Sequence, residues 1–127
     1  MNREEILREY PFLKPYPMNP EYLNEDTALM IDSIPDGWMV FIWDMVKEIK
    51  ECLIENNCLN EYMLCQVKEK YGSLRWYDNL TCTQDIISKY EDIAYHTCCV
   101  CGKEATKYSK GWILPFCDKC YSEVLGK

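Results

Sequence analysis

Apolar residues recur at intervals of three and four between residues 38 and 55, which is the spacing of an amphipathic helix. Charged side chains fill the opposite side, a Pro-Asp-Gly turn precedes the segment, and two asparagines follow it. The pattern predicts one long helix that buries a face made of Trp38, Phe41, Ile42, Met45, Val46, Ile49, Leu53 and Ile54. Met39 and Trp43 lie partly off that face, which leaves open a homodimer interface.

Two shorter segments, residues 62–67 and 73–77, have the composition and alternation of strands. A polar loop with a glycine, residues 68–72, separates them, so the pair predicts an antiparallel hairpin. Alternation in the second strand puts its leucine and tryptophan on one face and Arg75 and Tyr77 on the other.

A second helix is predicted over residues 84–95, with Thr83 as its cap and an apolar face of Ile86, Ile87, Tyr90, Ile93 and Ala94. Residues 1–35 are rich in proline and are expected to lie mainly extended over the surface, with a short helix over residues 2–10. We expect this segment to pack down through Phe12, Leu13, Tyr16 and Met18.

Charge is distributed unevenly along the 127 residues, whose formal net charge is −7. Residues 1–62 hold 13 acidic and 5 basic side chains, whereas residues 98–127 hold 3 acidic and 5 basic ones. The overall sign disfavours non-specific attraction to nucleic acid or to an anionic membrane. The chain has no apolar run of about 18 residues, and its charged beginning lacks a signal peptide's apolar core, so we expect a cytoplasmic protein.

Nine cysteines, an odd number, argue against a disulfide framework in a reducing compartment. Two Cys-x-x-Cys pairs, with 15 residues between them, lie in the last 30 residues. Two such pairs supply a tetrahedral set of four sulfurs, which suits Zn²⁺ and leaves no open position for water. The spacing predicts one structural zinc ion held by Cys98, Cys101, Cys117 and Cys120.

Two neighbouring residues are alternative ligands. Cys99 is adjacent to Cys98, but only one residue would then separate it from Cys101, which is poor geometry for chelation, so we assign Cys99 to packing. His96, the chain's one histidine, could replace a sulfur, although a residue at the C-terminus of a helix is its more common role. The predicted fold is thus α+β: an acidic unit (residues 1–97) with a small antiparallel sheet and two helices, and a zinc ribbon (residues 98–127) packed on it.

Catalytic groups are scarce in the sequence. No phosphate-binding glycine loop, His-Glu-x-x-His motif or deaminase signature occurs, so we predict that the chain is not an enzyme. The hairpin interleaves basic and aromatic residues, a composition that suits stacked bases and phosphates as well as ordinary strand packing. Its candidate contact residues for nucleic acid or a partner are Lys68, Lys70, Tyr71, Arg75 and Tyr77.

The stretch VKEKYGSLRWY (67–77), followed by C-x-x-C-G and by G-W with a second C-x-x-C, resembles a family of small phage and bacterial proteins. Members share a K-E-K-[FY]-G-x-L-R-[FW]-Y hairpin and a zinc-binding tail, and residues 32–120 carry the likeness. The resemblance implies a zinc-binding tail and a phage-linked setting, and it brings no activity with it. The doubled cysteine and the proline-rich acidic beginning depart from the pattern.

Two functional hypotheses follow. The first is a zinc-binding phage accessory protein that binds a host protein through its acidic surface, as an inhibitor of a nucleic-acid-handling defence system such as an RNA-guided complex, in the manner of an anti-CRISPR protein. The alternative is a small regulator that binds nucleic acid through the basic and aromatic residues of the hairpin and ribbon. The charge of the chain favours the first hypothesis.

Overall fold

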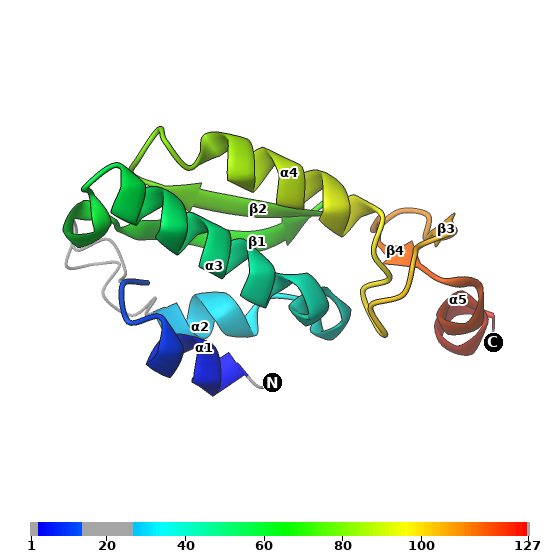
Figure 1. The fold of residues 1–127 in the computed structure, drawn as a ribbon. Helices are drawn as coiled ribbons and strands as arrows, with labels where there is room; N and C mark the ends of the chain where they lie inside the picture. Colours follow the sequence, from blue (N-terminus) through cyan, green and yellow to red (C-terminus); the bar gives the residue numbers. More distant parts are fainter. Residues whose placement is uncertain (1–2, 14–26, 127) are drawn as a thin grey trace.

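The computed structural model describes residues 3–13 and 27–126 as an α+β fold (Figure 1). Helices pack on one face of a hairpin and along its edges, and a smaller unit with a second pair of short strands follows at the C-terminus. The elements in order are α1 (Arg3–Glu9), α2 (Thr27–Asp32), η2 (Asp36–Trp38), α3 (Met39–Glu55), η3 (Leu59–Glu61), β1 (Leu64–Lys70), β2 (Ser73–Asp78), α4 (Gln84–Tyr95), β3 (Lys107–Tyr108), β4 (Pro115–Phe116) and α5 (Asp118–Leu125).

The main core lies between α3, α4 and one face of the hairpin β1–β2, which confirms the predicted arrangement. Trp38, Ile42 and Met45 on the helical side are fully buried, as are Leu74 and Trp76 on the strands. Each such side chain contributes roughly 1.5–3 kcal/mol through burial. The periodicity of the long helix and the alternation of the second strand therefore identified the residues that hold this unit together.

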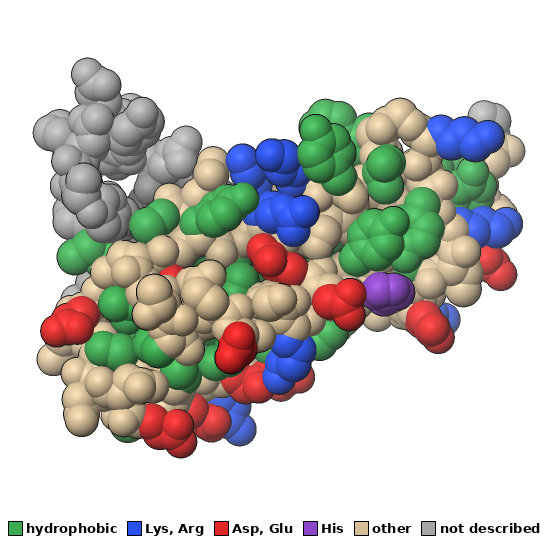
Figure 2. Space-filling view, turned by 90° about the horizontal axis from the view of Figure 1, so that it is seen from above, with side chains coloured by type: hydrophobic (Ala, Val, Ile, Leu, Met, Phe, Trp, Pro, Cys, Tyr) green, Lys and Arg blue, Asp and Glu red, His purple; other side chains and the backbone are tan. Residues whose placement is uncertain are grey.

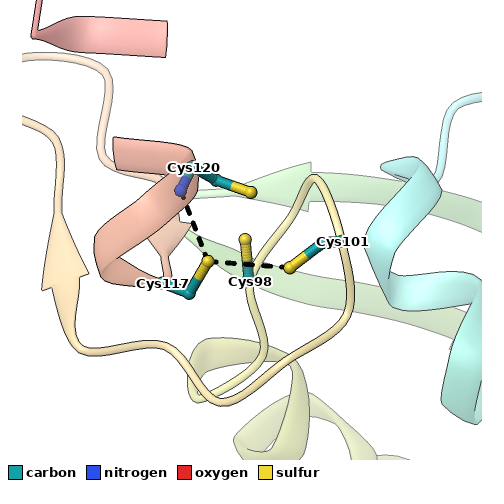
Figure 3. A group of neighbouring side chains, drawn as sticks. All are labelled: Cys98, Cys101, Cys117 and Cys120. Carbon is teal, nitrogen blue, oxygen red and sulfur yellow. Dashed lines mark hydrogen bonds between the residues drawn. The ribbon is translucent and has the colours of Figure 1, made fainter. Parts of the chain in front are cut away.

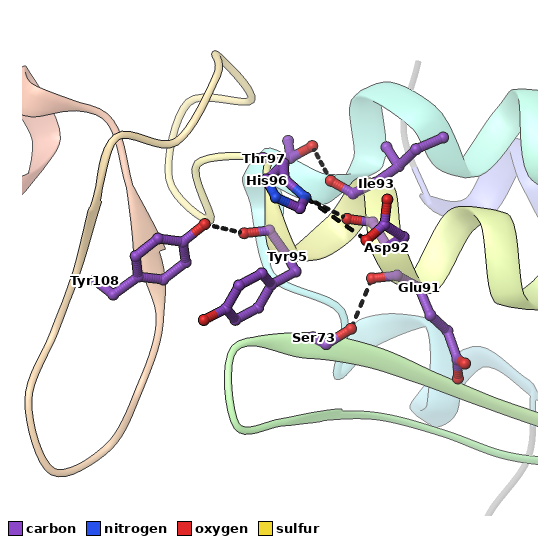
Figure 4. A network of polar contacts seen from close by, with 8 residues as sticks. All are labelled: Ser73, Glu91, Asp92, Ile93, Tyr95, His96, Thr97 and Tyr108. Atoms are coloured by element: carbon purple, nitrogen blue, oxygen red, sulfur yellow. Dashed lines mark hydrogen bonds and ion pairs between the residues drawn. The ribbon is translucent and has the colours of Figure 1, made fainter.

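Neighbouring elements cover both edges of the two-stranded hairpin. On the β1 side, the Ser33 hydroxyl donates to the Val67 carbonyl at 3.0 Å. On the β2 side, the Trp76 amide donates to the Glu91 carboxylate at 3.4 Å, and the Ser73 hydroxyl donates to the Glu91 carbonyl at 2.7 Å (Figure 4). A lone hairpin is marginally stable in water, so these contacts and the helices behind it are what make it a stable sheet.

The predicted five-residue loop of the hairpin is wrong. β1 continues to Lys70 and pairs with Ser73, so only Tyr71 and Gly72 form the turn. Both have positive φ, 52° and 82° respectively, as in a type I′ turn. The twist of this turn matches the twist of paired strands, and pairing therefore extends past the polar residues that suggested a loop.

The N-terminal segment is more helical than predicted. The short first helix is confirmed as α1, but α2 lies within residues 1–35, where we expected extended chain. Arg3 links the start of α1 to α2 and η2: its guanidinium donates to the Ile31 carbonyl and to the Asp36 carboxylate, both at 2.6 Å. A six-residue helix is too short to show periodicity, so tertiary contacts of this kind decide it.

Other predictions about this segment and the helix faces have mixed outcomes. Phe12 and Leu13 are buried as expected, whereas the predicted anchors Tyr16 and Met18 lie outside the described residues. Ile54 and Ile93, predicted on apolar faces, are exposed, while Met39 and Trp43 are half-buried against the core. The hydroxyl of Thr83 makes no cap hydrogen bond with α4. Among the described helices, none has the length and apolar character needed to cross a membrane.

Candidate metal centre

Two short elements bring the cysteine pairs together. The first pair follows α4 directly, and Gly102 leaves it with a φ of 84°, which favours glycine. Strands β3 and β4 then return the chain, and the second pair begins at Cys117, the cap residue of α5. The second strand of this unit, β4, has two residues, and Trp112 and its neighbours precede it without forming part of it.

The four predicted cysteines converge on one point (Figure 3). Their Sγ atoms all lie within 4.8 Å of one another, and those of Cys101 and Cys117 are 3.6 Å apart. Zinc–sulfur bonds of about 2.3 Å in a tetrahedron place sulfurs about 3.8 Å apart, so the spacing fits such an ion. Three of the side chains are buried, and that of Cys101 is exposed.

The surroundings of the cluster act differently on its thiols. Burial raises the pKa of Cys98, but hydrogen bonds from the backbone at Cys101, Cys117 and Val100 outweigh it and lower that pKa to about 6. Burial raises the pKa of Cys120, and the nearby thiols raise it further. A bound metal cation would offset the repulsion between neighbouring thiolates, so its positive charge would stabilise the deprotonated form of all four cysteines.

The alternative ligands lie outside this cluster. Cys99 is buried beside it, where burial and then the charge of Cys98 raise its pKa to about 11. The amide of Cys99 donates to the Pro115 carbonyl at 2.9 Å, so this residue joins β4 to the segment with the first cysteine pair. His96 is exposed, and its Nδ1 lies 2.9 Å from the Asp92 carbonyl oxygen (Figure 4).

Hydrogen bonds dock this C-terminal unit on the main core. The Gly37 amide donates to the Cys99 carbonyl at 2.9 Å, and the buried Trp38 indole donates to the Thr97 carbonyl at 3.0 Å. On the other side, the Tyr108 hydroxyl donates to the Tyr95 carbonyl at 2.7 Å (Figure 4). The segment with the first cysteine pair is therefore held against the start of α3, and β3 is held against the end of α4.

Four of the five hairpin candidates lie on the face opposite the buried one, and the fifth, Tyr71, lies in the turn. Lys68 and Arg75 are direct cross-strand partners, and Tyr77 lies on the same face. The ammonium of Lys70 lies 5.7 Å from the centre of the Tyr71 ring. In Figure 2 a group of basic side chains lies beside hydrophobic ones, apart from most of the carboxylates.

Sequence reasoning missed a second group of thiols. The Sγ atoms of Cys58 and Cys82 are 3.8 Å apart, and the Cys52 thiol donates to the Cys82 carbonyl at 3.2 Å. Burial raises the pKa of Cys52 and Cys58, which keeps both protonated. No spacing signal pointed to this group, because Cys82 is 24 residues beyond Cys58 in the chain and joins the other two only through the fold.

Comparison of the chain with protein-family models, curated proteins and solved structures found no match. The resemblance to small phage and bacterial proteins stays a prediction from the quoted residues.

Proposed function

We propose that Cys98, Cys101, Cys117 and Cys120 bind one Zn²⁺ ion and that its role is structural. The observation that carries this proposal is the convergence of four thiols within 4.8 Å. Thiolate sulfurs favour zinc among the common divalent ions, and four of them fill its tetrahedral shell. The buried residues around the cluster include one large apolar side chain, Phe116, so binding energy from the ion would supply much of the stability of this unit.

We further propose that the chain works by binding another protein and not by catalysis. A zinc ion with four protein ligands has no position for a reacting water. Support for a binding surface comes from the exposed carboxylates on the two long helices, at Asp44, Glu51, Glu55, Asp85 and Asp92. Carboxylates predominate in the lower half of the face in Figure 2. Such a surface complements a basic groove, the kind that handles nucleic acid.

The resemblance to phage proteins favours a host partner, and an acidic surface that occupies a basic groove would act as an inhibitor of a nucleic-acid-handling defence protein. Charge complementarity of this kind speeds association at low salt and weakens as salt rises. Binding is therefore expected to depend on the helical carboxylates and on ionic strength.

The metal is tested by elemental analysis of the purified chain, with one zinc per chain expected. Cys117→Ser should lose the ion, whereas Cys99→Ser should retain it because that thiol lies outside the cluster. Full zinc content in the Cys117 variant, or a folded wild-type chain without metal, would contradict the proposal.

The partner is tested by affinity capture from host lysate over a range of salt, followed by binding of the purified partner. A variant with Asp44→Asn, Glu51→Gln and Glu55→Gln should bind at least tenfold more weakly, and Lys47→Gln on the same helix is the matched control. Captured partners that bind both variants equally, or whose affinity is insensitive to salt, would rule out the acidic surface.

A further inference from the structure

The hairpin turn and the loop before β4 enclose a cavity of about 260 Å³ on the surface. Its lining includes two aromatic side chains, Tyr71 and Trp112, which are 69% and 74% exposed. Large aromatic rings are usually among the more buried side chains of a protein. Two such rings on one hollow, from segments about 40 residues apart, mark it as a binding feature.

Tyr71 is held in a conformation that tyrosine disfavours. Its φ of 52° lies in the left-handed region, where asparagine or glycine would form the same turn with less strain. In return, the protein presents the ring to solvent, with the ammonium of Lys70 5.7 Å from its centre. Backbone strain retained at an exposed aromatic residue points to a role in binding.

Glu69 fixes the opposite wall of the hollow. Its carboxylate accepts a hydrogen bond from the Trp112 indole at 2.9 Å and another from the Gly72 amide at 2.9 Å. One side chain thereby holds both the turn that carries Tyr71 and the ring of Trp112. The Ile113 side chain and backbone lie under Gly72, close enough that a Cβ there would meet them at 3.2 Å. The Trp112 ring and the turn that carries Tyr71 are therefore positioned before any ligand arrives.

Basic side chains continue from this hollow along the outward face of the hairpin. Lys70 lines the cavity, and Lys68 lies two residues along the same strand, opposite Arg75. The guanidinium of Arg75 lies 4.0 Å from the Glu91 carboxylate, so Lys68 and Lys70 carry most of the uncompensated positive charge on this face of the hairpin. The acidic residues that dominate the chain lie mainly on the helices behind the sheet.

We propose that this surface binds single-stranded nucleic acid, with one unpaired base between Tyr71 and Trp112 and phosphates along Lys70, Lys68 and Arg75. Bases of every kind stack on aromatic rings, and lysines beside them neutralise the backbone. Duplex would bind weakly, because its bases are already paired and stacked on one another and are not free to stack on the two rings. The surface is separate from the acidic helices, so this proposal and the protein-binding proposal can fail independently.

The test measures the binding of labelled oligonucleotides of about ten nucleotides to the full chain by fluorescence anisotropy at low salt. Single-stranded DNA, single-stranded RNA and duplex are compared. The difference in affinity between the two single strands shows whether the surface prefers deoxyribose or ribose. Tryptophan emission supplies a second signal. Trp38 and Trp76 are buried and Trp43 is half-buried against the core, so quenching by the bound base should come mainly from Trp112 and should decrease in Trp112→Leu.

Tyr71→Asn is the decisive variant, because asparagine accepts the left-handed turn and the chain should fold at least as well. Affinity for single strands should fall by about fivefold or more in Tyr71→Asn and in Trp112→Leu. Lys68→Gln with Lys70→Gln should reduce the slope of log affinity against log salt by about 1.4. Lys47→Gln and Tyr95→Leu, both outside this surface, are the controls and should bind as the wild type does.

Three outcomes would overturn the proposal. The first is that single strands do not bind at about 100 μM protein, a concentration in the range of weak non-specific binding. The second is that duplex binds more tightly than single strands, and the third is that folded Tyr71→Asn binds single strands with unchanged affinity. Displacement of the oligonucleotide by a trimethyllysine peptide that quenches Trp112 would assign the hollow to a cationic peptide instead.

Discussion

Replacing Gly37 with alanine is expected to push the cysteine-bearing unit away from the start of α3. A Cβ at this position would lie 2.1 Å from the Cys98 carbonyl oxygen and 2.8 Å from the Val100 amide nitrogen. These are backbone atoms of the first cysteine knuckle, so they cannot rotate away as a flexible side chain would. Either the segment with the first cysteine pair or the η2 turn must move by more than 1 Å, because ordinary van der Waals contact between the added Cβ and these atoms begins at 3.4 Å.

The cost has two parts. Forcing an extra methyl group into a packed interface costs about 1–3 kcal/mol. Movement of the knuckle also lengthens the hydrogen bond from the Gly37 amide to the Cys99 carbonyl, worth about 1 kcal/mol. We therefore expect the free energy of unfolding to fall by about 2–4 kcal/mol and the Tm by roughly 8–15 °C.

Thermal and urea denaturation of the zinc-loaded chain measure this effect, and elemental analysis should still find one zinc per chain. Gly111→Ala is the matched control, because a Cβ there meets no atom within 4 Å, and its φ of 78° adds left-handed strain of about 1 kcal/mol. A Gly37→Ala chain that melts within about 2 °C of the wild type, or above Gly111→Ala, would refute the docking argument.

Three further predictions concern separate parts of the molecule. Cys117→Ser, or removal of metal with a chelator, should unfold the C-terminal unit first, seen as lost amide protection confined to residues 98–126, whereas uniform loss would contradict a structural metal. Tyr71→Asn should raise the free energy of unfolding by about 1 kcal/mol by relieving a left-handed tyrosine, and a lower Tm would show that the ring stabilises the turn. Hydrogen bonds from Lys89 and then Tyr90 hold the pKa of Glu48 below its ordinary value of 4.5, so its stabilisation is present above pH 4.5 and is lost as the pH falls through the lowered pKa. Urea denaturation at neutral and acidic pH should accordingly show a smaller acid loss in Glu48→Gln than in the wild type, and equal losses would contradict this reading of the contact.

Local patterns were sufficient for the parts of the fold that depend on neighbours in the chain. The periodicity from Trp38 to Leu53 follows from burial on one side of a helix, and the hairpin follows from alternation in two adjacent segments. The four clustered cysteines were predicted for the same reason, since two Cys-x-x-Cys pairs carry their geometry in their spacing.

Contacts between distant segments decided the rest. The turn at Tyr71 is shorter than its polar residues suggest because cross-strand pairing outweighs local preference. The hollow between Tyr71 and Trp112, and the thiol pair of Cys58 and Cys82, join residues from distant loops and leave no periodic trace in the sequence. The sequence by itself determined the two long helices, the presence of the hairpin and the cysteine cluster, because all three arise from short-range spacing. Only the tertiary structure decided which exposed aromatic and basic side chains share one surface, because packing of the C-terminal unit against the hairpin brings them together.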